Sequence, residues 1–259
     1  MLNLALTAML FLPASPVLPL AQDETPEIVD KRPEIKELVE TLEDHIGKRG
    51  DEDPQAIEVI DRLYQEFPNC GKKDRGSIVD VLDDCFKVKR RESDEGVRDN
   101  ALYLAAAVTL RDMGPESAPV LMSWIGHKTH RKDIVLQEKL ILSLGKTKDE
   151  KGLKLLIKTL DDKTPAIQAA TAEALGEWEG EDQDLRKDTF DELKNLLLGV
   201  KGAVDSDPND TISRDRYDAI SAPIITSLQR LSGQKINDPN EWLRWWNKNK
   251  KADWDEPNG

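Results

Sequence analysis

The sequence lacks the motifs by which many enzymes are recognised. It contains no Gly-x-Ser-x-Gly elbow, no His-Glu-x-x-His zinc motif and no dinucleotide-binding glycine motif. An excess of basic residues is also missing, because 50 Asp and Glu outnumber 37 Lys and Arg and give a formal net charge of −13. Phosphate binding needs clustered Lys and Arg, so this balance argues against a nucleic-acid partner. We therefore predict a non-catalytic protein without cofactor or metal.

Cysteine is scarce: the chain has only Cys70 and Cys85. A helix that begins at Gly71 would hold the two sulfur atoms about 20 Å apart, too far for a disulfide. A helix that begins at Ser77 would leave a loop able to fold Cys70 back. Two separate thiols are the preferred interpretation, with pairing as the open alternative. The 15 glycines and 14 prolines are too few for a collagen-like or linker-dominated chain.

The first 22 residues contain no charged side chain. An apolar core from Leu2 to Leu12 is followed by three prolines and then by Ala21. This order is typical of a secretory signal peptide over residues 1–21. The alternative is an uncleaved membrane anchor, but the apolar core is well short of the roughly 20 residues that span a bilayer. We expect an exported protein, periplasmic or extracellular, without a transmembrane span in the mature chain.

The rest of the chain is predicted to be helical, because apolar residues recur at helical spacing and the alternation of a half-buried strand is absent. Residues 22–50 hold an acidic stretch and one helix, from Pro33 to about Lys48. Residues 51–234 form the repeat domain described below. Its further helices are expected to begin at Asp53 and at Asp74 or Ser77, and to cover Leu185–Val200 and Ile220–Leu231, with a loop over Gly202–Asp210.

Two local patterns superficially suggest metal ligands. His127 and His130 lie three residues apart, but no matching Cys, Asp or Glu pattern accompanies them, so we expect both to be exposed turn residues. The run Asp205–Asp210 begins like a calcium loop. Asp210 and Arg216 then stand where such a loop requires Gly and Glu, so a solvated acidic loop is the preferred interpretation.

A repeat of 31 residues is the most informative feature of the sequence. Gly114, Gly145 and Gly176 follow one another at this spacing, each preceded by Met or Leu. A fixed period in the range of 20–50 residues, with two short helices in each unit, is the mark of a solenoid in which neighbouring units share one core. We expect each glycine to lie just past a helix and to close its last turn with a positive φ.

The segment from Leu142 to Gly176 resembles a HEAT repeat, more narrowly the short type also found in phycobilin lyases. In that family a Leu-rich first helix, an Asp-containing turn and an Ala-rich second helix ending in Leu-Gly follow one another. Asp162 matches the turn, and Gln168 stands where the family usually has Arg. The matches to the second helix are Ala169, Ala170, Ala172 and Ala174. The resemblance implies an all-α solenoid of stacked antiparallel helix pairs, but it implies no particular activity.

The C-terminal segment 235–259 concentrates four of the six tryptophans: Trp242, Trp245, Trp246 and Trp254. It resembles the tail of exported bacterial HEAT-repeat proteins of uncharacterised role. Asp238-Pro239 supplies a helix start, and the first three tryptophans fall at positions i, i+3 and i+4, on one helical face. We expect a helix that caps the last repeat. Together with Arg244, the same rings could instead bind sugars or a membrane surface.

These features predict an exported scaffold that docks another protein, possibly a basic one, through salt-sensitive contacts. The expected binding surface is the ridge of second helices, where we predict exposed side chains at Gln137, Glu138, Gln168 and Glu173. A first alternative is a carbohydrate- or envelope-surface-binding module that uses Trp242, Trp245, Trp246 and Arg244. A second is a lyase-like enzyme, by analogy with the phycobilin lyases, although no nucleophile or acid–base pair is identifiable.

Overall fold

The computed structural model describes residues 30–90 and 99–255; the predicted signal peptide lies outside these ranges. Within the described residues the chain forms eleven α-helices and three short 3₁₀ helices and no strand, which confirms the all-α prediction. The α-helices are α1 (Pro33–Gly47), α2 (Asp53–Glu66), α3 (Lys72–Lys87), α4 (Ala101–Asp112), α5 (Ala118–Trp124), α6 (Ile134–Thr147), α7 (Glu150–Thr159), α8 (Pro165–Gly176), α9 (Gln183–Ser206), α10 (Thr211–Ser232) and α11 (Pro239–Asn249). The 3₁₀ helices are η1 (Phe67–Asn69), η2 (Gly114–Ser117) and η3 (Glu177–Gly180).

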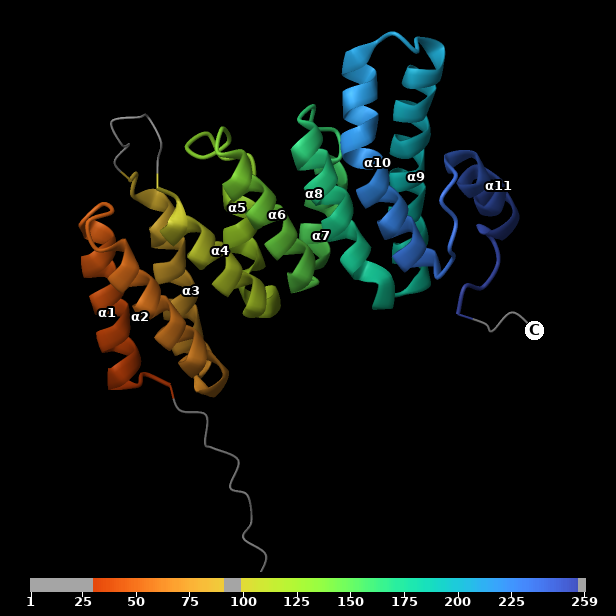
Figure 1. Cartoon of the computed structure of the whole chain (residues 1–259). Coiled ribbons are helices and arrows are strands. Elements are labelled where there is room, and N and C mark those ends of the chain that lie inside the picture. The colour runs from red at the N-terminus through yellow and green to blue at the C-terminus, as the bar shows by residue number, and fades with distance from the viewer. Residues whose placement is uncertain (1–29, 91–98, 256–259) are drawn as a thin grey trace, which may run out of the picture.

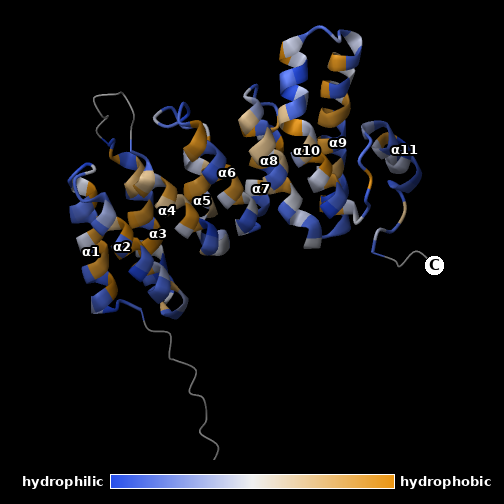
Figure 2. Cartoon of the chain, in the orientation of Figure 1, coloured by the Kyte–Doolittle hydropathy of each residue, from blue (hydrophilic) through white to orange (hydrophobic). Residues whose placement is uncertain are grey.

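The helices are arranged in two rows. In one row, α2, α4, α6, α8 and α10 each contact the next member, and in the other row α1, α3, α5 and α7 do the same. The molecule is therefore elongated, with α1 at one end and α11 at the other (Figure 1). The longer hairpin of α9 and α10 extends beyond the shorter helices (Figure 1). Hydrophobic residues lie along the helices, whereas the connecting turns are mostly hydrophilic (Figure 2).

Local sequence explains where the central helices begin and which face they bury. Asp149 caps α7 by accepting a hydrogen bond from the backbone N–H of Gly152 at 2.8 Å. Leu153 and Leu156, three residues apart, are then buried on one face of this helix. Pro165 occupies the first turn of α8, where its missing N–H costs nothing. Buried apolar residues from all eleven α-helices join one core that runs from Ile35 in α1 to Trp242 in α11.

The repeated glycines do not share the role predicted for them. Gly114 follows α4 with a φ of +72°, as expected, but Gly145 lies inside α6 and Gly176 is the last residue of α8, so the prediction is wrong for both. A Cβ atom at Gly145 would lie 2.7 Å from the carbonyl oxygen of Ala174 in α8. A Cβ atom at Gly176 would lie 3.2 Å from the Cα of Ser227 in α10. These two glycines therefore allow neighbouring helices to approach closely.

Two predicted boundaries also differ from the structure. Helix α3 begins at Lys72, and both cysteines are free and buried, so the separate thiols are confirmed. The predicted loop from Gly202 to Asp210 is wrong in its first half, because α9 continues to Ser206. An ion pair of 2.8 Å between Lys201 Nζ and Asp205 Oδ2, at positions i and i+4, supports this extra turn.

Candidate functional site

The row α4–α6–α8 carries apolar side chains on its solvent side. Leu104, Val135 and Ala166 occupy equivalent positions, each 31 residues from the next, on three helices that contact one another in order. Val135 is 56% exposed, and Leu104 and Ala166 are half-buried. The half-buried apolar side chains of these three helices also include Ala105, Val108, Leu142 and Ala169. We call this set of seven residues the outward face.

Two of the four acidic or amide residues predicted for the ridge border the outward face. Glu138 of α6 is half-buried and Glu173 of α8 is exposed. Gln137 and Gln168 are 3% and 0% exposed, so the prediction that their side chains are exposed is wrong. The structure thus brings only Glu138 and Glu173 to the surface, beside the apolar positions.

Gln137 and Gln168 are buried because their amides bind backbone groups at the end of the preceding helix. Gln137 accepts from the N–H of Gly126 at 2.6 Å and donates to the carbonyl oxygen of Trp124. Gln168 donates to the carbonyl oxygen of Leu160 at 2.6 Å and accepts from Arg216 Nε at 3.0 Å. These hydrogen bonds satisfy carbonyl groups that a helix end leaves without a partner. The two glutamines therefore hold the first and second helix of each pair together.

An ion-pair cluster joins the C-terminal ends of α6 and α10 to η3. Glu177 accepts from Lys146 and from Arg230, the latter at 2.9 Å, and Arg230 also pairs with Glu179 at 2.9 Å. Burial opposes the ionisation of Glu177, but the hydrogen bonds from Arg230 and Lys146 outweigh it and lower its pKa to about 2. The cluster therefore connects three successive members of the even-numbered row.

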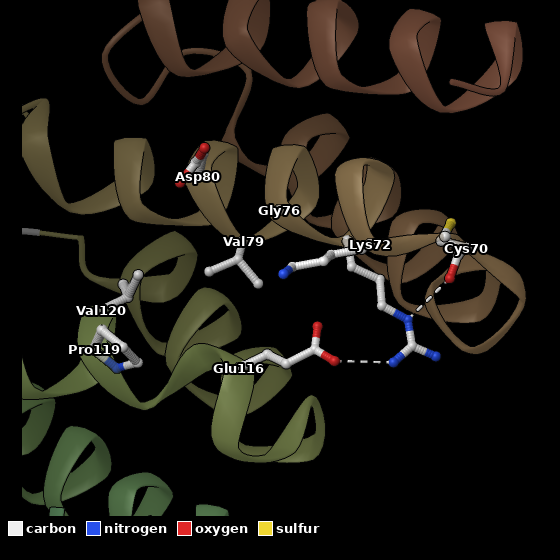
Figure 3. Close-up of a pocket in the computed structure, with 10 residues that line it drawn as sticks. Cys70, Lys72, Gly76, Val79, Asp80, Glu116, Pro119 and Val120 are labelled. Carbon is white, nitrogen blue, oxygen red and sulfur yellow. Dashed lines mark hydrogen bonds and ion pairs between the residues drawn. The ribbon is translucent and has the colours of Figure 1, made fainter. Parts of the chain in front are cut away.

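A groove of about 720 Å³ lies between α3 and the segment η2–α5 (Figure 3). Val79, Pro119 and Val120 supply its apolar wall, and an ion pair of 3.0 Å between Arg75 Nη1 and Glu116 Oε1 crosses one end. Cys70 also lines the groove, and burial raises the pKa of its thiol, which disfavours the thiolate form. The two sides come from distant parts of the sequence, and no sequence pattern predicts the groove.

The predicted aromatic cluster is confirmed, and Phe190 of α9 lies at its centre. The ring centroids of Trp242, Trp245, Trp246 and Trp254 are 5.5, 5.4, 5.2 and 5.5 Å from that of Phe190. Asp238 caps α11 by accepting from the N–H groups of the two residues after Pro239, as its sequence predicts. Trp242 is fully buried and the other three tryptophans are half-buried.

Cations of α9 add to this cluster. Lys194 Nζ lies 5.6 Å from the ring centre of Trp246, and Lys187 Nζ lies 5.7 Å from that of Trp254. Arg244, predicted to act with the tryptophans, is instead exposed. Its Nη2 lies 3.7 Å from Oε1 of Glu241 on the same helix. The structure therefore joins the four tryptophans to α9 but leaves Arg244 on the solvent side.

The prediction that both histidines are exposed is wrong for His130, which is 1% exposed, and His127 is only half-buried. Nε2 of His130 lies 2.8 Å from the carbonyl oxygen of Phe86, and its ring packs edge-on against Tyr103 and Trp124. Among the described residues, no group of three or more His, Cys, Asp or Glu side chains is placed to hold a metal ion. No helix in the described ranges has the length and hydropathy to cross a bilayer.

Comparison with known proteins identifies no relative of this chain. No protein-family model, no curated protein and no solved structure matches it.

Proposed function

We propose that the chain is a HEAT-like α-solenoid that serves as a non-catalytic docking scaffold in an exported protein. Support for the solenoid comes from the two helix rows and from equivalent residues spaced by 31. Gly145 and Gly176 both lie at contacts between successive even-numbered helices, and Gln137 and Gln168 both bind the end of a first helix. Repeated contacts of this kind are what a stacked array of similar units requires.

The outward face is the proposed docking surface, and the alignment of Leu104, Val135 and Ala166 is the observation that carries the proposal. Each residue lies on a helix whose other face is already buried, so apolar contact with a partner would remove further hydrophobic surface from water. Glu138 and Glu173 beside this face would favour basic side chains in the partner. Apolar positions flanked by carboxylates fit a protein partner that binds reversibly and with salt sensitivity.

The experiment is a pull-down at low and high salt with the mature chain and two variants. Val135→Glu places a charge in the outward face, whereas Ile212→Glu makes the same kind of change at a 79% exposed residue of the α9–α10 hairpin. We expect Val135→Glu to lose the partners retained by the wild-type chain and Ile212→Glu to keep them. The proposal is wrong if both variants retain the same salt-sensitive partners.

A second candidate is binding of carbohydrate or of the cell envelope through the tryptophan cluster. The partial exposure of Trp245, Trp246 and Trp254 favours it, because part of each ring remains available for stacking. Replacement of Trp245 and Trp246 by Ala distinguishes a cap from a binding site. Loss of stability supports the cap, whereas unchanged stability with lost polysaccharide retention supports the envelope-binding function.

A further inference from the structure

Helix α7 carries a row of lysines that forms no ion pair with any carboxylate of the described residues. Lys151, Lys154 and Lys158 are all exposed and lie at positions i, i+3 and i+7, which share one helix face. None of the ion pairs among the described residues includes any of the three. Exposed lysines elsewhere in the chain, such as Lys36 and Lys87, do pair with carboxylates on their own helices.

The sequence around α7 carries a net positive charge, although the whole chain is net negative. Residues 128–163 contain ten Lys and Arg and six Asp and Glu, a local net charge of +4 in a chain of −13. Two of these acids are helix caps, since Asp133 accepts from the N–H of Leu136 and Asp149 from that of Gly152. Of this excess, α7 carries +2 and residues 128–133, before α6, carry +2, whereas α6 adds +1 and residues 160–163 subtract one charge.

A hollow of about 350 Å³ with one apolar wall and a polar remainder adjoins the end of this lysine row. Ile125, Ile134, Leu155 and Ile167 line it, and Lys158 and Arg131 stand at its edge. Both cations are exposed, and Arg131, like Lys158, is absent from the ion pairs of the described residues. Asp161 and Asp162 also border the hollow, and Asp162 caps the turn before α8 by accepting from the N–H of Thr164 at 2.7 Å.

We propose that the lysine row and the hollow together bind an acidic protein segment that carries one apolar anchor residue. The three lysines attract carboxylates along about 10 Å of helix, the rise over seven residues. The apolar wall of the hollow would accept a side chain such as Leu or Ile. A simple polyanion would use only the lysines and leave the hollow empty, whereas an acidic peptide with an apolar residue uses both features.

The lysine row is distinct from the outward face, whereas the hollow is lined partly by Ile134 of α6 and Ile167 of α8. Helix α7 belongs to the odd-numbered row and packs against α6 and α8 from the other layer. A basic surface here and an acidic border at Glu138 and Glu173 would allow two different partners to bind at once. The inference therefore goes beyond the proposed function, and the two are tested separately, because Lys151, Lys154 and Lys158 are not part of the outward face.

The probe is a fluorescently labelled peptide of alternating Glu and Asp with one central Leu, and its binding is followed by anisotropy at low and high salt. The test variant is Lys151→Gln, Lys154→Gln and Lys158→Gln combined. Its matched control removes the same charge from exposed lysines of the C-terminal segment, through Lys248→Gln, Lys250→Gln and Lys251→Gln. Gln and Lys have similar helix propensities, so both variants should fold, and circular dichroism verifies it.

We expect roughly tenfold weaker binding by the α7 variant, because each exposed charge pair contributes about twofold. The affinity of the control variant for the peptide should stay within about twofold of that of the wild-type chain. High salt should weaken peptide binding by the control and by the wild-type chain. Replacement of the central Leu of the peptide by Ser should weaken binding several-fold. If the triple variant unfolds, Lys158→Gln alone is measured instead, and we expect its affinity for the peptide to fall about twofold.

Three outcomes would overturn the proposal. Equal affinity of the α7 variant and the control shows that only the overall charge matters. Equal affinity of the Leu and Ser peptides excludes the hollow as the anchor site. Polyglutamate or anionic lipid vesicles that bind as tightly as the Leu peptide show that the surface recognises a polyanion or a membrane instead.

Discussion

The central and C-terminal regions of the chain pack their helices together with side chains of opposite size. In residues 134–176, glycine and alanine let neighbouring helices approach until a single added carbon would clash with backbone atoms. In residues 183–254, four tryptophans and Phe190 pack α11 and the segment after it against α9, and cations of α9 lie near the rings. The comparison shows that a repeated contact is built from small side chains, whereas a terminal contact, which is made only once, can use large ones.

The largest loss of stability is expected where one side chain contacts all four rings of the tryptophan cluster. Phe190→Ala removes the ring at the centre of the four tryptophans and leaves a cavity. We expect the free energy of unfolding to fall by about 3–5 kcal/mol. Chemical denaturation followed by tryptophan fluorescence measures this change, and a loss below 1 kcal/mol would mean that the tryptophans pack without Phe190.

The central region is tested by the opposite change, the addition of one carbon. Gly145→Ala places a Cβ 2.7 Å from the carbonyl oxygen of Ala174, and we expect a loss of about 1–3 kcal/mol. Gly199→Ala in α9 is the matched control, because nothing lies within 4 Å of the added Cβ, and helix propensity predicts a gain of up to about 1 kcal/mol. Thermal unfolding that ranks the two variants in the reverse order would contradict close packing at Gly145.

The smallest loss of stability is expected for the ion pairs of Glu177, which join the C-terminal ends of α6 and α10 to η3. Because the folded-state pKa of Glu177 is lowered to about 2, its contribution is present above pH 4.5 and is lost as the pH falls toward 2. Arg230 is 30% exposed, so solvent screening reduces the contribution to about 1 kcal/mol. Glu177→Gln should be less stable than the wild-type chain at pH 7 and equal to it near pH 2.

Urea denaturation of both chains at several pH values measures this difference. Glu173→Gln serves as the control for the loss of a carboxylate, because Glu173 is exposed and belongs to no ion pair of the described residues. A constant difference between Glu177→Gln and the wild-type chain over the whole range would rule out the pair as a source of pH dependence.

The sequence was sufficient for the helical class and for several details. Asp238-Pro239 identified the start of α11, because a helix cap is a local signal. Gly145 and Gly176 were misassigned because a glycine can be required for a positive φ or for a close approach. Only the position of the neighbouring helix distinguishes these cases.

The surface was harder to predict for a related reason. Gln137 and Gln168 were expected to be exposed because polar side chains usually are, but each binds a carbonyl group that the end of another helix leaves free. The hollow beside α7 combines Ile125 and Ile167, which are 42 residues apart. Such sites depend on how the rows pack, and the periodicity of a single helix carries no information about that.

The close contact at Gly145 has a consequence for how the length of the chain can change. Its partner, Ala174, lies just before Gly176, which makes the next contact of the same kind with Ser227. Duplication of about 31 residues in this region would supply both a new glycine and a new small partner for it. The protein could thus lengthen by whole units, whereas an insertion of one or two residues inside α8 would turn Gly176 away from α10 and disrupt the contact.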